Sequence, residues 1–326
     1  MMQQLRIGMI GTGWFSQVHA DNLIVMEGLK LQAICGSSID KGKQMAKHYG
    51  ANGYGNVTEM LEAEQLDAVY ICVPPMVHGE IEEQLIERGI PFLVEKPIAI
   101  NSEVPRQLLQ KIKDKSLLTS VGYHLRYKET VHQMKQLLSE QMVGMAVGQW
   151  MGSMPGVSWW RQQEGSGGQF IEQTTHIVDI LRYCLGEVEE VYAVYGNRVA
   201  HEQHENVSVA DVGTVTLKLM NGVIANISNT CILPGNVDQS GITFYTNEGL
   251  LDWNNNRLNV VTSNIRTEYS DPTNPYVAES EAFIHAIRTG DSSRIRSDYE
   301  DAFKTQLVTS AALESANTGL PTKIQY

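Results

Sequence analysis

The sequence is poor in cysteine and carries no concentration of positive charge. It has four cysteines among 326 residues and a formal net charge of −12, with no block of lysine and arginine. The cysteines are scattered, mostly within apolar runs, at Cys35, Cys72, Cys184 and Cys231. Their scatter argues against a disulfide framework or a zinc site and predicts reduced core residues. The acidic balance argues against a nucleic-acid-binding surface.

Long apolar runs are also missing. No run approaches the length of a membrane span, and the N-terminus opens straight into a strand with no apolar signal segment. Internal repeats and low-complexity stretches are not evident. Hydrophobic residues at 42% and charged residues at 19% are typical of a soluble globular protein, and the length suits two domains. We therefore expect a cytoplasmic protein with no membrane partner.

The first part of the chain alternates strand-like and helical segments. Short apolar runs occur at 5–10, 29–35, 68–73, 92–94 and 119–123, with helical segments between them. Strands that alternate with helices over about 120 residues indicate an α/β class domain with a doubly wound parallel sheet. The prediction is a dinucleotide-binding Rossmann domain over residues 1–122.

The first of these strands leads into a glycine-rich turn. Gly11 and Gly13 match the G-x-G-x-x-G dinucleotide pattern, with Ser16 in the third place. Gly11 would allow the tight turn, Gly13 the close approach of a pyrophosphate, and Ser16 the packing of helix against strand. Trp14 and Phe15 open the helix, whose N-terminus favours phosphate. We expect Gly11, Gly13, Trp14 and Phe15 to bind the cofactor, although two glycines after a strand often mark only a turn.

The end of the second strand bears on which cofactor is bound. An acid usually holds the ribose of NAD at this place, but the strand ends in glycine followed by Ser37 and Ser38, with no acid until Asp40. We expect Ser38 to cap the next helix and Asp40 to lie in its first turn. The hydroxyls, with Lys41 or Lys43, could hold a 2′-phosphate. The pattern therefore favours NADP over NAD, unless it is an ordinary turn.

The motif Glu95-Lys96-Pro97 follows the buried strand at 92–94. In an open parallel sheet, ligands bind beyond the carboxyl ends of the strands, so Lys96 would face a ligand there. Lysine can carry a proton, and Pro97 restricts the backbone that presents it. Glu95, Lys96, Pro74 and His78 are predicted cofactor contacts. The alternatives are a surface Glu–Lys pair and, for His78, a helix cap.

The second part of the chain has antiparallel character. Residues 212–220 alternate apolar and polar side chains, turn at Asn221-Gly222 and resume over 223–227. Asn-Gly is a strong hairpin signal, because both residues of a two-residue hairpin turn need a positive φ. Further strand-like runs occur at 188–195, 242–246 and 258–262. We expect an α+β domain over 123–326 whose sheet leaves one face exposed or paired, which predicts a homodimer or homotetramer.

One segment of this second domain carries ionisable residues at helical spacing. Residues 165–168 are glycine-rich and precede a predicted helix over 170–185. Glu172, His176, Asp179 and Tyr183 fall at i, i+4, i+7 and i+11 and share one face of that helix. The rest of the helix is mainly apolar, so it is predicted to be buried with this polar stripe lining something. A solvated face is the alternative, and Glu-x-x-x-His supplies too few ligands for a metal.

The order of these motifs resembles the glucose–fructose oxidoreductase / inositol dehydrogenase (Gfo/Idh/MocA) family. The motifs are the glycine-rich turn, a Pro-x-x-His-type segment, Glu-Lys-Pro, Arg126 within 121–127, and Gly-Gly-x-x-x-(acid)-x-x-x-His. The resemblance covers most of the chain. It implies NAD or NADP on an N-terminal Rossmann domain, and a C-terminal domain with an open, mostly antiparallel sheet for substrate binding and oligomerisation. Glu172 stands where many sugar and inositol dehydrogenases of the family have aspartate.

The resemblance also implies a reaction, namely reversible hydride transfer between nicotinamide and a hydroxyl or carbonyl carbon of a sugar, cyclitol or related polyol. Lys96 matches the family's catalytic lysine and His176 its catalytic histidine, with Glu172 expected to orient His176 or bind a second hydroxyl. Tyr123 and Arg126 are expected to contact substrate, and no metal is expected. A redox-assisted glycosidase and a non-catalytic dinucleotide-binding sensor remain as alternatives.

Overall fold

The computed structural model describes residues 4–326. The chain forms two compact units, which are described separately below. Residues 4–99, 103–124 and 274–301 form the first unit, and residues 100–102, 125–273 and 302–326 form the second. The predicted boundary between 122 and 123 stays a prediction. The structure adds that a segment from late in the chain, 274–301, packs with the N-terminal residues.

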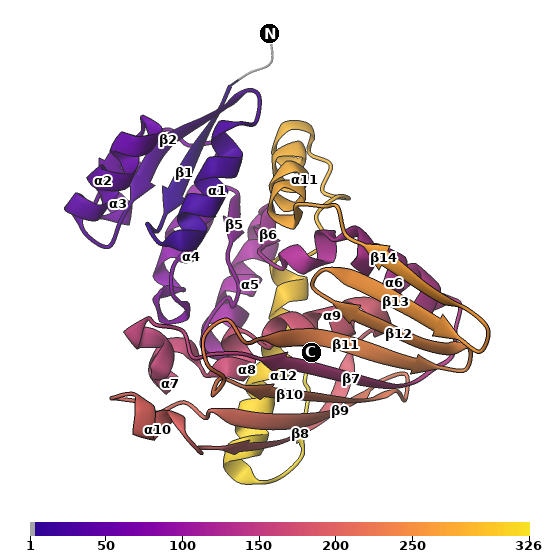
Figure 1. Cartoon of the computed structure of the whole chain (residues 1–326). Coiled ribbons are helices and arrows are strands. Elements are labelled where there is room, and N and C mark those ends of the chain that lie inside the picture. The colour runs from indigo at the N-terminus through magenta and orange to yellow at the C-terminus, as the bar shows by residue number, and fades with distance from the viewer. Residues whose placement is uncertain (1–3) are drawn as a thin grey trace. The chain divides into compact units, whose positions relative to one another are not determined.

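The first unit contains a six-stranded parallel sheet in the order β3-β2-β1-β4-β5-β6 (Figure 1). Its strands are β1 (Leu5–Ile10), β2 (Leu29–Cys35), β3 (Asn52–Tyr54), β4 (Ala68–Ile71), β5 (Phe92–Val94) and β6 (Thr119–Val121). The order reverses between β1 and β4, as in a doubly wound fold, and this confirms the predicted class. The central strands are apolar throughout because helices cover both faces of a parallel sheet.

Helices connect and cover these strands. They are α1 (Trp14–Ile24), α2 (Ile39–Tyr49), α3 (Val57–Ala63), α4 (Glu80–Arg88), α5 (Glu103–Lys115) and α11 (Pro275–Thr289), with a short 3-10 turn η1 (Pro75–Val77). Ser38 caps α2 as predicted, since its side chain accepts from the backbone N–H of Lys41. Helix α4 ends at Gly89, which has the left-handed φ of 67° that glycine tolerates.

Helix α11 reaches the first unit from the far end of the chain. It packs along α1, and Phe283 and Ile284 enter the same apolar core as Ile7 and Leu23. Phe283 is fully buried. This helix is therefore part of the core of the dinucleotide-binding unit, and the linear sequence gives no sign of that placement.

The second unit contains a nine-stranded sheet in the order β14-β13-β12-β11-β7-β10-β9-β8-β15. Its strands are β7 (Val143–Met151), β8 (Val188–Gly196), β9 (Val212–Leu219), β10 (Ile224–Thr230), β11 (Gln239–Thr246), β12 (Gly249–Asn254), β13 (Arg257–Thr262), β14 (Arg266–Ser270) and β15 (Thr322–Lys323). All neighbours are antiparallel except β7 and β10, which run parallel. The predicted mostly antiparallel sheet is confirmed.

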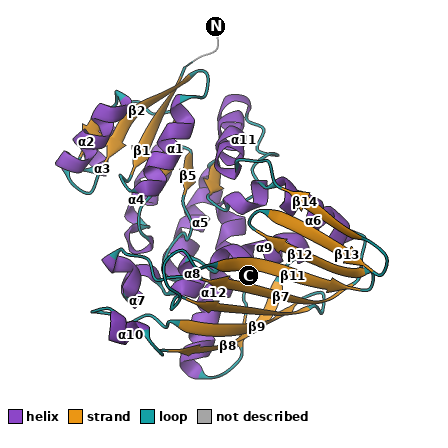
Figure 2. Cartoon of the chain, in the orientation of Figure 1, coloured by secondary structure: helices purple, strands orange, loops and turns teal. Residues whose placement is uncertain are grey.

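One face of this sheet is covered by helices, as Figure 2 shows by colour. The helices of the unit are α6 (Glu129–Ser139), α9 (Thr175–Leu185) and α12 (Tyr299–Thr318, which begins in the first unit), with short segments η2 (His124–Tyr127), η3 (Ser158–Arg161), α7 (Gln163–Ser166), α8 (Gln169–Glu172) and α10 (Ala200–Gln203). Side chains of α6, α9 and α12 share one core with the inward positions of the strands. Within residues 4–326, no helix is both long and apolar enough to cross a membrane.

The predicted hairpin at Asn221-Gly222 is confirmed, but its turn geometry differs from the expectation. Gly222 has a φ of 90°, whereas the φ of Asn221 is not positive. The backbone N–H of Gly222 donates to the carbonyl of Leu219 at 2.9 Å. A longer loop that ends in one left-handed glycine closes the hairpin without requiring Asn221 to adopt a positive φ.

The prediction of a single helix over 170–185 was wrong. Helix α8 stops at Glu172 and α9 starts at Thr175. The Gln169 carbonyl accepts from both Gln173 N and Thr174 N, each at 2.9 Å, which interrupts the regular spacing. Gln169 is also tied down through its side chain, which donates to the Thr230 carbonyl at 3.0 Å. The start of α8 is therefore bound to the end of β10, and the helical hydrogen-bond pattern is interrupted before α9 begins.

Candidate active site

In the glycine-rich turn after β1, Gly11 is closely packed and Gly13 faces open space. A Cβ on Gly11, which has a φ of +117°, would lie 2.1 Å from the Cys72 carbonyl oxygen. A Cβ on Gly13 would meet nothing within 4 Å. Gly13 is the N-cap of α1 and supplies no side-chain cap, and Ser16 is fully buried against the strand. The N-terminal turn of α1 therefore presents backbone N–H groups beside open space, which suits a phosphate.

The open space beside Gly13 suits the pyrophosphate of a dinucleotide. Glycine leaves this space unfilled, and the N-terminus of α1 favours the negative charge of a pyrophosphate. Trp14 is 66% exposed and its ring meets that of Phe15 edge-on at 4.7 Å. The structure thus places Gly11, Gly13, Trp14 and Phe15 at one turn. Their contacts with a cofactor remain predictions.

At the end of β2 the structure brings hydroxyls and an amine together. The Lys41 ammonium donates to Ser37 Oγ at 3.1 Å, and both residues are exposed. Ser38 is used as the cap of α2, and Asp40 lies in the first turn of that helix. The group that a ribose or a 2′-phosphate would meet here is therefore the Ser37–Lys41 pair.

Beyond β5, Glu95 is turned into the protein. It is 4% exposed, and its Oε1 hydrogen-bonds with His19 Nε2 at 2.8 Å. A Cβ on Gly122 would lie 2.8 Å from the Glu95 carboxyl carbon, so glycine at that position makes room for the carboxylate. Burial would raise the pKa of Glu95, but the hydrogen bond with His19 and the charges of His19 and Lys96 outweigh it and lower the pKa. Lys96 itself is half-buried.

Two aromatic rings stack beside this carboxylate. The His124 and Tyr276 rings are 4.2 Å apart and nearly parallel. Burial lowers the pKa of His124 to about 4, although the Glu95 charge opposes that shift. His124 is therefore neutral at neutral pH. Tyr123, the preceding residue in the chain, is 2% exposed, and its predicted substrate contact stays a prediction.

His78 occupies the start of α4. Its Nδ1 hydrogen-bonds with Glu82 Oε1 at 2.5 Å, while Glu82 Oε2 accepts from the backbone N–H of Gly79 at 2.7 Å. Pro74 precedes the 3-10 turn η1. These contacts organise the N-terminus of α4. They match the alternative of a helix cap, and cofactor contacts by Pro74 and His78 remain predictions.

In the second unit, tryptophans hold the two predicted catalytic side chains. Trp160 Nε1 donates to Glu172 Oε2 at 2.6 Å. The His176 ring stacks on that of Trp150, with centroids 5.6 Å apart and planes 23° from parallel, and His176 is 5% exposed. The break between α8 and α9 separates the two residues. Glu172 is held by a hydrogen bond from one tryptophan, and His176 stacks on another. The sequence did not reveal either contact.

Arg126 forms a buried ion pair with Asp179 of α9. Arg126 Nε and Nη2 donate to Asp179 Oδ2 and Oδ1 at 2.7 and 2.6 Å. Thr305 Oγ1 donates to Asp179 Oδ1 at 2.9 Å and accepts from Arg182 at 2.6 Å. His176 and Asp179 of the predicted polar stripe are buried, whereas Glu172 and Tyr183 are partly exposed. The predicted substrate contact of Arg126 stays a prediction.

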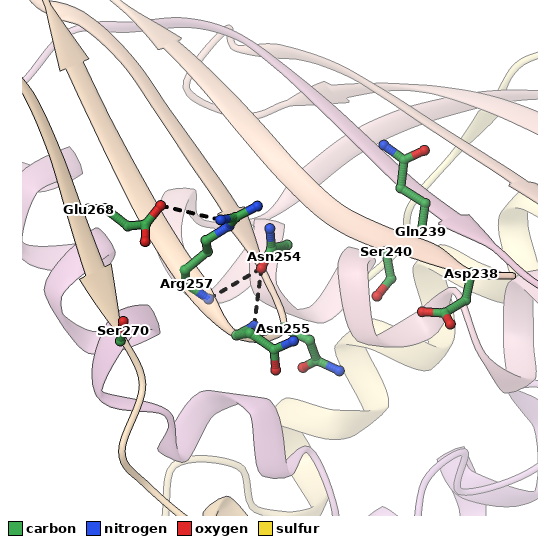
Figure 3. A pocket seen from close by; sticks show the side chains of 9 residues that line it. Asp238, Gln239, Ser240, Asn254, Asn255, Arg257, Glu268 and Ser270 are labelled. Atoms are coloured by element: carbon green, nitrogen blue, oxygen red, sulfur yellow. Dashed lines mark hydrogen bonds and ion pairs between the residues drawn. The ribbon is translucent and has the colours of Figure 1, made fainter. Parts of the chain in front are cut away.

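The second unit also has an open polar hollow of about 440 Å³ at the ends of β11 to β14 (Figure 3). It is lined by Asp238, Gln239, Ser240, Asn254, Asn255, Asn256, Arg257, Glu268 and Ser270. Figure 3 shows Arg257 directed toward Glu268. Arg257 Nη1 donates to Glu268 Oε2 at 3.3 Å, and Asn254 Oδ1 accepts from the backbone of Asn256 and Arg257. The predicted site residues lie elsewhere. We therefore assign the hollow no catalytic role.

Sequence reasoning missed two members of a buried polar group in the first unit. His19, Glu95 and Glu279 come from α1, the end of β5 and α11, and they bring one imidazole and two carboxylates together. Sequence reasoning named Glu95 as a cofactor contact and did not name His19 or Glu279. Tyr276, one helical turn before Glu279, was also missed.

Comparison with known proteins agrees with this geometry. Residues 5–123 match the model of an oxidoreductase family with an NAD-binding Rossmann fold, and residues 131–252 match the GFO/IDH/MocA C-terminal domain. Myo-inositol 2-dehydrogenase of Thermotoga maritima is 26% identical over 69% of this chain and 68% of its own. Levoglucosan dehydrogenase of Pseudarthrobacter phenanthrenivorans is 22% identical over 97% of both chains.

The same fold is found in a solved structure of levoglucosan dehydrogenase in complex with NADH and levoglucosan. It superposes with a TM-score of 0.90 at 20% identity, over 99% of this chain and 100% of that one. The two family matches cover most of the present chain, and their order is the order of its two predicted domains. The chain is an oxidoreductase that belongs to the Gfo/Idh/MocA family.

Proposed function

We propose that the protein transfers a hydride reversibly between C4 of a nicotinamide and a carbon that bears a hydroxyl or carbonyl, in a sugar, cyclitol or related polyol. One observation carries this proposal. Lys96 follows β5 at the carboxyl edge of the parallel sheet, the edge at which the turn of Gly11 and Gly13 leaves open space. The names of the relatives, an inositol and a levoglucosan dehydrogenase, support the substrate class.

The cofactor would be held by the elements at that edge. Gly11, Gly13 and the first turn of α1 would bind the pyrophosphate, with Trp14 and Phe15 beside it. The nicotinamide, when bound, supplies the hydride donor or acceptor. We infer that NADP(H) is accepted at least as well as NAD(H), because Ser37 and Lys41 offer donors to a 2′-phosphate.

The proton of the reacting hydroxyl would be handled by two residues. His176 would exchange it as general acid/base, and Lys96 would hydrogen-bond the same oxygen and stabilise its developing charge. Glu172 would orient His176 or bind a second hydroxyl. The contacts with Trp150 and Trp160 support these roles, because a fixed side chain loses less conformational freedom when substrate binds.

The uncovered face of the nine-stranded sheet is the surface that we propose for a homodimer or homotetramer. Apolar side chains are exposed there on neighbouring strands, namely Met145, Val147, Ile224 and Tyr245. An exposed apolar patch of this kind marks an association surface. Light scattering coupled to gel filtration would measure the oligomer, and a monomer at micromolar concentration would contradict the proposal. We further propose a cytoplasmic location, in keeping with four free cysteines.

The test is a screen of sugars, cyclitols and their oxidised forms with each cofactor, followed by nicotinamide absorbance. With a substrate in hand, Lys96→Ala and His176→Ala are each expected to lower kcat/KM by about 100-fold or more while the protein stays folded. Lys47→Ala, an exposed lysine on α2, is the control and should keep the wild-type rate. Wild-type rates in both test variants would remove Lys96 and His176 from the chemistry.

The same assay separates the two alternatives. A redox-assisted glycosidase would turn over a glycoside without net consumption of cofactor. A sensor would bind cofactor and turn over nothing, and substitutions of Lys96 and His176 would then leave its binding of nicotinamide cofactor unchanged.

A further inference from the structure

Beneath Lys96 the first unit contains a closed group of ionisable side chains. Ligand atoms of His19, Glu95 and Glu279 all lie within 4.8 Å of one another, and all three residues are buried. Glu279 and His19 have no exposed surface, and Glu95 is 4% exposed. Two carboxylates this close and this deep cannot both be ionised without a large cost in repulsion and lost solvation.

The two carboxylates differ in their partners. Glu95 accepts from His19 at 2.8 Å. Both carboxyl oxygens of Glu279 lack a hydrogen-bond partner within the described residues. A buried ionised carboxylate without a donor is much more costly than a neutral carboxyl group. The geometry therefore assigns the negative charge to Glu95 and leaves Glu279 as the group that stays neutral.

The charged and titratable groups around the pair agree with that assignment. The other titratable groups around the group are Tyr70 on β4, whose ring lies 5.4 Å from that of His19, Cys72 after β4, Lys96 after β5, His124 on η2 and Tyr276 on α11. The positive groups act on Glu95, whose pKa is lowered despite its burial. Burial and the Glu95 charge raise the pKa of Glu279 well above its ordinary value.

A metal ion is the competing occupant of such a group. It would require Glu279 to be ionised, and the three residues supply three ligand atoms, whereas zinc takes four ligands and calcium six to eight. The remaining ligands would have to be waters in a place where the side chains have almost no exposed surface. A proton needs one oxygen and no further ligands, so it fits the site better.

We propose that Glu279 is a buried proton-binding site, which takes up one proton on folding and leaves Glu95, the residue before Lys96, as the only ionised carboxylate of the group. Resting on the proposed hydride transfer, this makes Glu279 a positioning residue for Lys96 that acts through Glu95. An ionised Glu279 would repel the Glu95 carboxylate and weaken its contact with His19. Lys96, the next residue along the backbone, would then lose the fixed conformation that its role requires.

The first experiment measures stability and needs no substrate. Above the ordinary glutamate pKa of about 4.3, Glu279 gives up its proton in the unfolded chain but keeps it in the folded one. Rising pH therefore reduces the contribution of Glu279 to the stability of the wild-type fold until its folded-state pKa is reached. The amide in Glu279→Gln cannot titrate, so this variant should gain in folding constant relative to wild type by about tenfold per pH unit between roughly pH 5.5 and 7.5. Urea unfolding at several pH values measures this ratio.

Glu281→Gln is the matched control, since Glu281 is an exposed carboxylate on the same helix. Its ratio to wild type should not change with pH. A flat ratio for Glu279→Gln would overturn the proposal, because it would show that Glu279 is ionised in the folded protein. Binding of one Zn²⁺ per chain by wild type, lost in Glu279→Gln, would overturn it in favour of a metal.

The second experiment tests the positioning role. Glu279→Ala removes the neutral side chain that lies within 4.8 Å of Glu95, so Glu95 and Lys96 should be held less firmly. This variant should lower kcat at least tenfold, with the KM for cofactor little changed. Glu279→Gln, which keeps the shape and stays neutral, should restore most of that loss. A Glu279→Gln enzyme as slow as Glu279→Ala, or a Glu279→Ala enzyme as fast as wild type, would overturn this role. If no substrate is found at all, the proposed function fails while the stability experiment still decides the proton site.

Discussion

The pair of Arg126 and Asp179 allows a prediction of its energetic contribution. Two charge-assisted hydrogen bonds of 2.7 and 2.6 Å join them, and their side chains are 3% and 1% exposed. Arg126→Met keeps most of the apolar length of the side chain and removes both donors to Asp179. Breaking a buried ion pair by removing one partner costs about 3–5 kcal/mol, because the other charge stays buried without its counter-ion.

The expected loss of unfolding free energy in Arg126→Met is therefore about 3–5 kcal/mol, with a fall of roughly 6–20 °C in Tm at about 2–4 °C per kcal/mol. Four of the five tryptophans lie in the second unit, at Trp150, Trp159, Trp160 and Trp253. Tryptophan fluorescence during urea unfolding thus reports mainly on the unit that contains the pair.

The double variant Arg126→Met/Asp179→Leu should recover most of the loss, since an apolar replacement of a whole buried pair is often close to neutral. Lys218→Met, which breaks the exposed pair of Lys218 with Glu189, is the control and should leave the unfolding curve unchanged. A loss below about 1 kcal/mol in Arg126→Met would refute the reasoning. A KM for substrate that rises in the folded variant would instead support the predicted substrate contact of Arg126.

Two further predictions concern pH and cofactor. His124 is neutral in the fold, with a pKa of about 4 against about 6.5 unfolded, so its contribution to stability should fall by roughly 3 kcal/mol as the pH drops from about 6.5 to about 4. His124→Phe keeps a ring against Tyr276 and should flatten that fall, and an unchanged slope would contradict the assignment. Ser37→Asp should weaken NADPH relative to NADH by at least tenfold in fluorescence titrations, since a carboxylate repels a 2′-phosphate. A variant that still prefers NADPH would place the phosphate elsewhere.

The fold of the first unit could be predicted because its strands are continuous apolar runs that end at glycine or proline. The runs at 5–10 and 29–35 match β1 and β2 residue for residue. A parallel sheet that is buried on both faces leaves this simple pattern in the sequence. The glycine turn and the Glu-Lys-Pro motif could be placed at the carboxyl edge of that sheet for the same reason, because each directly follows one of these strands.

The second unit was less predictable because long-range pairing stabilises its strands. The central strand β7 was missed, and it contains Gly144 and Gly148, which disfavour a strand when only local sequence is considered. The structure explains one of them, because a Cβ on Gly148 would lie 2.6 Å from the Ile177 side chain of α9. Close packing of helix on sheet therefore requires a residue that weakens the local strand signal. Such a requirement is visible only once both elements are placed.

The missed polar residues have a common physical origin. Sequence periodicity identifies a core face by its apolar residues, so a charged residue on that face is read as an exception or as solvated. Glu279 lies on the same face of α11 as Phe283 and Ala286, at i, i+4 and i+7, and both of these are buried. A carboxylate within an apolar stripe must find a counter-ion or hold a proton, since it cannot be buried as a lone charge. Its neighbour Glu95 follows a strand that is distant in sequence. The apolar stripe of α11 therefore indicates that Glu279 is unusual, but it does not indicate the role of Glu279. Glu95 carries a negative charge and cannot be the counter-ion, and His19 already binds Glu95. Glu279 is therefore the group that holds a proton.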